Sequence, residues 1–110
     1  MIFYRIVYHD PPTLDDLSPR NVRGPRPART DPETLRLQSG ISVFRAIQQS
    51  RSRARRSPNL GYLIAVLDIR EGGEIQFERT TASRGHYTLW GDPAILLGCV
   101  TMVVAINELS

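Results

Sequence analysis

The chain has 110 residues and a formal net charge of +3, with 14 basic and 11 acidic side chains. This length fits one domain with a single core. Its one cysteine, Cys99, excludes an intrachain disulfide and a multi-cysteine metal site, and fits a reducing, cytoplasmic setting. No apolar run reaches the roughly 20 residues of a membrane-spanning helix, and the N-terminus lacks the pattern of a secretion signal. We therefore expect a soluble protein with no membrane partner.

All the basic residues are arginines, and the chain contains no lysine. A guanidinium pairs with phosphate or carboxylate through two parallel hydrogen bonds. The bias therefore favours an anionic partner, although the arginine-rich coding of a GC-rich genome would produce the same composition.

The N-terminal part of the chain predicts one strand followed by a long loop. Residues 2–8 are β-branched and aromatic, with Arg5 on an otherwise apolar face. Arg5 either covers apolar surface with its stem while its head reaches water, or points into a cleft and binds a ligand. Two prolines end the strand, and residues 13–17 form a single helical turn. Residues 18–30, rich in proline and arginine, form a loop without regular structure.

Two helices and a short strand are expected next. The Asp-Pro-Glu sequence at residues 31–33 is a strong helix start, and this helix ends near residue 38, with Gly40 in the left-handed conformation. Residues 41–44 form a brief strand that leads directly into a second helix, which continues to residue 56.

The second helix separates basic from apolar side chains. On a helical projection its basic side consists of Arg45, Arg51, Arg53, Arg55 and Arg56. This Arg45 to Arg56 side offers contacts to the phosphates of nucleic acid or to an acidic protein, but no aromatic residue is interleaved to stack on bases. A solvated helix face is the alternative.

A long apolar strand and a polar strand follow. Residues 60–69 are apolar on both faces, as in a central strand. The double glycine at residues 72–73 predicts a tight hairpin into a partner strand over residues 75–80. A tight turn would place Glu78 opposite Leu67, whereas a bulged turn would shift the match by one residue.

The C-terminal third completes the expected sheet. Residues 86–90 form a strand that contains three ring-bearing side chains, and a second Asp-Pro pair starts a short helix over residues 94–97. Residues 99–106 form a last strand, buried on both faces. Together these elements predict a single α+β domain with a central, mixed, twisted sheet of five or six strands and three or four short helices on its faces.

Few motifs of known chemistry occur. The chain has no P-loop, no dinucleotide glycine fingerprint and no HExxH sequence. His9, Asp10, His86 and Asp92 are the conceivable metal ligands, but they lack the helical spacing that would hold them together, so we expect no metal. The two histidines would alternatively support acid–base cleavage of RNA, one taking the 2′-hydroxyl proton and the other protonating the leaving oxygen. This interpretation is a metal-independent, RNase-like toxin.

Three segments carry a resemblance to a known family: Tyr4-Arg5, the strand Gly40-Ile-Ser-Val-Phe44, and the apolar strand from residue 61 to 69. A first strand with Arg or His, a Gly-x-Ser/Tyr-aromatic strand leading into an Ala- and Arg-rich helix, and then an apolar strand make the chain resemble the small ADP-ribosyltransferase-like toxin domains of bacteria. The resemblance spans residues 3–79, by order of elements more than by identity. It implies a toxin or phage-derived effector that uses NAD to modify a macromolecule and that has an acidic protein partner such as an antitoxin.

The resemblance also implies residues that bind NAD. The first-strand cation, Arg5 or alternatively His9, would hydrogen-bond the ribose next to nicotinamide. Ser42 and Phe44 would shape the nicotinamide pocket. A chain that kept this fold without the catalytic carboxylate would be a non-catalytic binding module.

Glu78 is the catalytic carboxylate that the resemblance implies, acting together with Arg5. A bond that breaks with positive charge developing on the ribose requires a fixed carboxylate nearby. An ordinary exposed strand carboxylate is the alternative for Glu78. His86 and Tyr87 would be further pocket residues, with a structural histidine as the alternative for His86. This interpretation requires the side chains of Arg5 and Glu78 to converge on one shared pocket.

Overall fold

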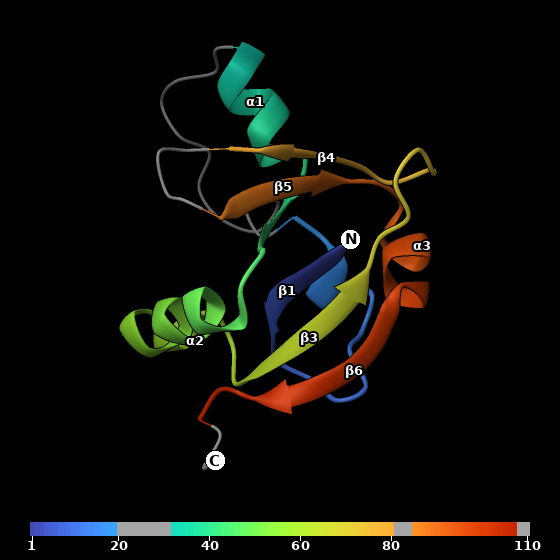
Figure 1. Ribbon diagram of the computed structural model, residues 1–110. Coiled ribbons are helices and arrows are strands. Elements are labelled where there is room, and N and C mark those ends of the chain that lie inside the picture. Colours follow the sequence, from blue (N-terminus) through green and yellow to red (C-terminus); the bar gives the residue numbers. More distant parts are fainter. Residues whose placement is uncertain (20–31, 81–84, 108–110) are drawn as a thin grey trace.

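The computed structural model describes residues 1–19, 32–80 and 85–107 (Figure 1). The strands are β1 (Ile2–Val7), β2 (Ile41–Phe44), β3 (Leu63–Asp68), β4 (Gln76–Arg79), β5 (His86–Trp90) and β6 (Val100–Ala105). The helices are α1 (Pro32–Gln38), α2 (Ile47–Arg56) and α3 (Pro93–Gly98), with 3₁₀ turns η1 (Asp15–Leu17) and η3 (Pro58–Leu60). Most of the loop expected over residues 18–30 lies outside the described residues.

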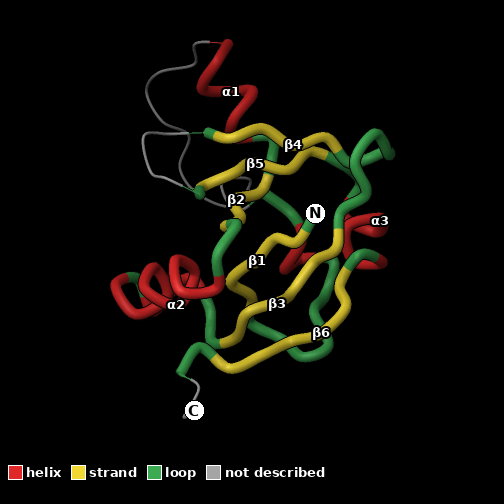
Figure 2. Tube along the Cα trace, viewed as in Figure 1, coloured by secondary structure: helices red, strands yellow, loops and turns green. Residues whose placement is uncertain are grey.

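The six strands form one sheet in the order β4-β5-β2-β1-β3-β6, and every neighbouring pair is antiparallel. This confirms the α+β class and the expected number of strands, while the sheet is antiparallel throughout rather than mixed. The register between β1 and β2 has a single pair, Tyr4 with Phe44. The sheet therefore has two three-stranded halves, β4-β5-β2 and β1-β3-β6, which meet at this β1–β2 seam (Figure 2).

The prediction of a hairpin between β3 and β4 is wrong. β3 pairs with β1 and β6, whereas β4 pairs with β5 at the far edge of the sheet. Gly72 has a positive φ of 75°, as expected, but residues 69–75 connect two different halves of the sheet. Glu78 consequently lies opposite Thr88 and not Leu67. The physical reason is that β3, apolar on both faces, takes a central position, and polar β4 takes an edge.

The last strand also differs from expectation. Within the part of the chain that the structure describes, β6 pairs with β3 alone, so it forms the second edge of the sheet. It is also not buried on both faces. Thr101, Met102 and Ala105 are exposed, Met102 by 56%. An apolar run has the same sequence pattern in a central strand and in an unprotected edge strand, which explains the error.

Glycine is needed at position 40, between α1 and β2, for a different reason than expected. Positive φ occurs at three other glycines of the described chain, and not at Gly40. A Cβ atom at Gly40 would lie 2.4 Å from Cγ2 of Thr88 and 2.7 Å from the carbonyl oxygen of Leu89. Glycine is therefore required here because the chain entering β2 approaches β5 closely.

The two faces of the sheet are covered by different elements. The main core consists of Phe3, Val7, Leu17, Ile41, Val43, Ala65, Leu67, Ile69, Ile75, Leu89 and Leu96. Leu17 belongs to η1 and Leu96 to α3, so these elements cover this side, which we call the core face. On the opposite side Ile6 and Ile64 pair and are buried, and α2, which contributes no residue to the main core, contacts β1 and β2.

Candidate functional site

Strand pairing decides which of the candidate residues share a face of the sheet. Phe44 pairs with His86, Ser42 pairs with Thr88, and Thr88 also pairs with Glu78. Directly paired residues in antiparallel strands project to the same side. The side opposite the core face therefore carries a set of mainly polar side chains, which we call the polar face: Ser42, Phe44, Glu78, Thr80, His86, Thr88 and Trp90.

Arg5 lies on the core face and is only 4% exposed. Its Nε donates to the carbonyl oxygen of Asp16 at 3.2 Å, its Nη1 to that of Ser42 at 2.9 Å, and its Nη2 to that of Ser18 at 3.4 Å. These bonds tie the η1 segment to β2 across the seam. Arg5 therefore neither reaches water nor points into a ligand cleft, and its role is structural.

The expected convergence of Arg5 and Glu78 is not found. Tyr4, and not Arg5, is level with Phe44 in the sheet. Alternation along β1 therefore sends Arg5 to the core face, while Glu78 lies on the polar face through its pairing with Thr88. The two residues implied to act together thus lie on opposite sides of the sheet.

Tyr87 also lies on the core face. Its ring centroid is 5.2 Å from that of Phe3 and 6.3 Å from that of Phe77, and the rings are tilted relative to one another. Such aromatic packing stabilises the core. Tyr87 is therefore separated from its neighbour His86, which lies on the polar face.

His9 takes part in a turn that is centred on a buried carboxylate. Its Nδ1 lies 3.0 Å from Oδ2 of Asp16. Oδ2 also accepts a hydrogen bond from the backbone N–H of Thr13, and Oδ1 accepts one from the backbone N–H of Tyr8. Burial alone would raise the pKa of Asp16, but these hydrogen bonds and His9 outweigh it and hold the pKa below the usual 3.8. His9 therefore stabilises the turn after β1.

The structure does not bring the two histidines together. His86 pairs with Phe44, which pairs with Tyr4 near the middle of β1. His9 lies beyond Val7, and the strand from Tyr4 to Val7 alone spans about 10 Å. The acid–base pair that an RNase-like reaction requires is therefore not formed by His9 and His86.

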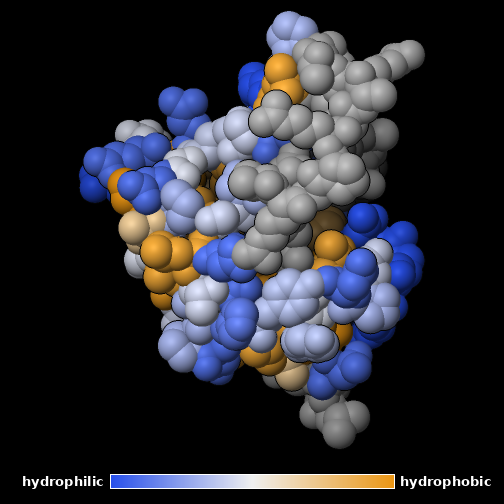
Figure 3. Space-filling model, turned by 180° about the vertical axis from the view of Figure 1, so that it is seen from behind, coloured by the Kyte–Doolittle hydropathy of each residue, from blue (hydrophilic) through white to orange (hydrophobic). Residues whose placement is uncertain are grey.

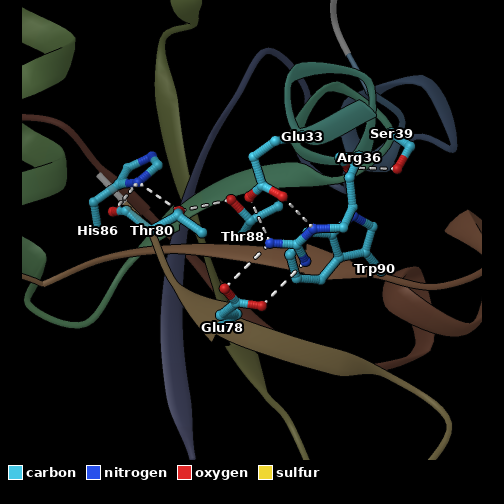
Figure 4. Close-up of polar contacts among 8 residues, drawn as sticks. All are labelled: Glu33, Arg36, Ser39, Glu78, Thr80, His86, Thr88 and Trp90. Carbon is cyan, nitrogen blue, oxygen red and sulfur yellow. Dashed lines mark hydrogen bonds and ion pairs between the residues drawn. The ribbon is translucent and has the colours of Figure 1, made fainter. Parts of the chain in front are cut away.

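A chain of hydrogen bonds fixes one part of the polar face (Figure 4). Thr80 Oγ1 lies 2.8 Å from Thr88 Oγ1 and 3.1 Å from Nδ1 of His86. The same nitrogen is 3.1 Å from the carbonyl oxygen of Thr80. A ring nitrogen that faces a carbonyl oxygen is the donor, so the neutral ring has its acceptor at Nε2. The ring also packs edge-on against Phe44, with centroids 5.4 Å apart.

Arg36 of α1 holds Glu78 in a bidentate pair. Its Nη1 donates to Oε2 of Glu78 at 3.1 Å, and its Nη2 donates to Oε1 at 3.2 Å. The side chain of Glu78 is nevertheless 53% exposed. Two parallel hydrogen bonds orient a carboxylate more strictly than one. Glu78 is therefore both oriented and accessible to a ligand.

Glu33 and Trp90 complete this cluster (Figure 4). Arg36 donates from Nε and Nη2 to the carboxylate of Glu33, at 3.2 and 2.8 Å. The guanidinium carbon lies 4.9 Å from the Trp90 ring centroid, and Trp90 Nε1 donates to the carbonyl oxygen of Arg36 at 2.9 Å. The hydrogen bonds that Arg36 donates to Glu33 and Glu78 raise the pKa of Arg36. One cation thus serves two carboxylates.

The basic side of α2 differs from the expected one in two residues, Arg51 and Arg45. Arg53, Arg55 and Arg56 are exposed, and we call them the α2 basic face. Arg51 is 7% exposed, because it follows Ile47 by one helical turn and shares the buried side of the helix. Figure 3, seen from behind, shows hydrophilic atoms gathered on the side of the molecule where α2 lies.

Arg45, the remaining member of the expected basic side, precedes α2. Its Nη1 donates to the carbonyl oxygen of Ile2 at 2.7 Å, and its guanidinium carbon lies 5.5 Å from the ring centroid of Phe3. The residue is exposed but bound to the first strand. It therefore lies apart from the α2 basic face.

Searches for other kinds of site are negative. Within residues 1–19, 32–80 and 85–107, no group of three or more His, Cys, Asp or Glu side chains is arranged to hold a metal ion. In the same part of the chain, no helix has the length and apolar character needed to cross a membrane. Comparison with protein-family models, curated proteins and solved structures finds no match.

Sequence reasoning missed the residues that orient Glu78. Arg36 follows Glu33 by three positions on a helix, which is the spacing of a local ion pair and was a usable signal. Thr88 lies two residues from His86 and therefore shares its face, which alternation could have indicated. The contact between Arg36 and Glu78 joins segments that are distant in sequence, so no local sequence pattern predicts it.

Proposed function

We propose that this domain is an ADP-ribosyltransferase-like protein that binds NAD on the polar face. The observation that supports the proposal is that strand pairing gathers Ser42, Phe44, Glu78 and His86 on this one face. The family resemblance implies an NAD-site role for each of the four. Arg5 and Tyr87 lie on the core face, so the convergence of Arg5 with Glu78 that the resemblance requires is not met. The proposal therefore rests on the four residues of the polar face and gives no role to a cation of the first strand.

The proposed reaction breaks the N-glycosidic bond between nicotinamide and its ribose. Nicotinamide leaves as a neutral molecule with the electron pair of that bond, and positive charge develops at C1′ of the ribose. Glu78, oriented by Arg36, stabilises this charge. A nucleophile of the target macromolecule then attacks C1′ and loses its proton. A toxin or phage-derived effector with an antitoxin partner would use such chemistry.

The other residues of the polar face would bind the cofactor. The rings of Phe44 and His86, which pack against each other, offer an edge for the nicotinamide ring. Ser42 is exposed and supplies a hydroxyl group.

Nicotinamide release from NAD tests the proposal. The wild-type chain is incubated with NAD beside Glu78→Gln and the matched variant Glu33→Gln. Each substitution removes one carboxylate from Arg36, so any effect on α1 is shared. We expect Glu78→Gln to abolish release and Glu33→Gln to retain it. Release at the buffer rate by the wild type, or equal loss in both variants, would contradict the assignment.

A second function, anion binding, is favoured by the α2 basic face. Its three exposed arginines lie on a helix whose ten residues include no acid. They suit the phosphates of a nucleic acid or the carboxylates of an acidic protein. We expect the affinity for RNA or DNA to fall steeply as salt rises, and to fall at every salt concentration when Arg53, Arg55 and Arg56 are replaced by glutamine. A flat salt response would remove this function.

A further inference from the structure

Among the described residues β6 pairs with β3 alone, so its outer side forms one edge of the sheet. Its sequence, VTMVVA, contains neither a charged residue nor a proline. Soluble proteins usually guard such an edge with charge, proline, a β-bulge or a covering element. The ladder with β3 has a register shift at Val66 and Leu67, and the residues from Met102 to Ala105 form the regular part of β6. The other edge strand, β4, is guarded by Glu78 and Arg79. The two edges of the same sheet thus differ, and β6 is the one suited to accept another strand.

The backbone of β6 has hydrogen-bonding groups that point away from the sheet. The N–H of Asp68 donates to the carbonyl oxygen of Cys99 at 3.0 Å, so this residue faces β6. Val66, two positions earlier, faces the same way and pairs with Met102. Val103 therefore directs its N–H and C=O groups to the side opposite β3.

The two ends of β6 carry opposite charge. At its C-terminal end Arg55 donates from Nε to Oδ1 of Asn107 at 3.0 Å, and the rest of the α2 basic face lies on the same helix. The N-terminal end adjoins the end of β3 and the connection that follows it. This acidic end has three exposed carboxylates and one exposed guanidinium: Asp68, Glu71, Glu74 and Arg70. The N-terminal ammonium group of Met1 lies 3.4 Å from Oδ1 of Asp68, whose side chain is still 60% exposed.

We propose that β6 pairs in antiparallel fashion with β6 of a second copy of this chain, about a twofold axis. An antiparallel arrangement sets the C-terminal end of each β6 against the N-terminal end of the other. Arg55 of each copy thereby approaches Asp68 of its partner. The same uncharged edge serves both copies, as an isologous interface requires. The pairing joins two six-stranded sheets into one and leaves no open β6 edge.

Sedimentation velocity of the full chain over a wide concentration range tests the pairing. We expect a concentration-dependent dimer. Val103→Pro removes an outward N–H group without removing a bond to β3, and it should weaken dimerisation at least tenfold. Val103→Ile is the matched control and should dimerise like the wild type. A wild type that is monomeric up to millimolar concentration would overturn the proposal.

Two further sets of variants keep the test decisive if Val103→Pro fails to fold. Met102 is already exposed, so Met102→Lys should fold while setting like charges near the twofold axis, and Met102→Gln is its neutral control. Only the lysine variant should weaken the dimer. Arg55→Glu and Asp68→Arg should each weaken it, and the double variant should restore it. A dimer indifferent to all these changes uses another surface and contradicts the proposal.

Discussion

Arg5 on the core face and Arg36 on the polar face have the same side chain but different roles. The difference follows from how deeply each one is buried. Arg5 is nearly inaccessible and donates to backbone carbonyl oxygens, so it fixes how segments of the fold lie. Arg36 is exposed and donates to two carboxylates, so it fixes the orientation of functional groups. Loss of the first should affect stability, and loss of the second should affect binding and activity.

Replacing the Arg5 guanidinium should have the largest effect on the stability of the fold. Arg5→Met leaves the buried carbonyl oxygen of Asp16 and the partly buried one of Ser42 without their charged donor. We expect the free energy of unfolding to fall by about 3 kcal/mol. Urea denaturation measures this loss. Arg5→Lys should recover only part of it, because an ammonium group lacks the planar fork. A wild-type midpoint for Arg5→Met would show that the bonds contribute nothing to stability.

The close approach at Gly40 should show the next largest effect. A methyl group there meets both a side chain and a carbonyl oxygen of β5, so Gly40→Ala should destabilise the fold by about 2 kcal/mol. Gly98→Ala is the matched control, since nothing lies within 4 Å of its Cβ position and alanine favours helix. Thermal unfolding of both variants compares them. Equal melting temperatures would mean that β5 moves aside at little cost.

The carboxylate of Asp16 should give a pH-dependent effect of about 1–2 kcal/mol. Its pKa is lowered in the folded state, so its stabilisation is fully present above the ordinary pKa of 3.8 and is lost as pH falls through the lower folded value. Asp16→Asn should therefore be less stable than the wild type at neutral pH, and the difference should shrink in acid. Urea midpoints between pH 2 and 7 measure it. A difference that grows in acid would contradict the assignment.

Breaking the exposed cluster should change stability least. Arg36→Met removes ion pairs that water already screens, so the urea midpoint should barely move. Nicotinamide release should fall nevertheless, because Glu78 loses the group that orients it. Arg36→Lys should restore part of the activity. A large loss of stability in Arg36→Met would contradict the conclusion that Arg36, unlike Arg5, contributes little to the stability of the fold.

The sequence predicted those parts of the fold that depend on local signals. The strand over residues 86–90 has the predicted bounds, and the helix that starts at Pro93 begins where its Asp-Pro signal indicates. Strand order was not predictable from local signals, because pairing partners are chosen by contacts between distant segments. Alternation along the first strand correctly predicted that Arg5 lies on the same face as Phe3. The face of Glu78 could not be predicted in this way, because it depends on the pairing of β4 with β5 and of β5 with β2.

The candidate site was predicted in part for the same reason. Ser42 and Phe44 lie two positions apart on one strand, so their common face follows from alternation alone. Glu78 and His86 joined them through long-range registers. The family resemblance assigned Arg5 to the site as its first-strand cation, whereas in the structure Arg5 donates to backbone carbonyl oxygens on the core face.

The seam between β1 and β2 has a mechanical consequence. Within each half, neighbouring strands pair over four or more residues, whereas β1 and β2 share one registered pair. The side chains of Arg5 and Arg45 and the packing of Phe3 on Tyr87 also join the two halves. Separating β1 from β2 would therefore break fewer strand pairs than separating any other two neighbouring strands. Because Arg5 donates to the carbonyl oxygen of Ser42, this buried side chain also helps to fix the strand that carries Ser42 and Phe44.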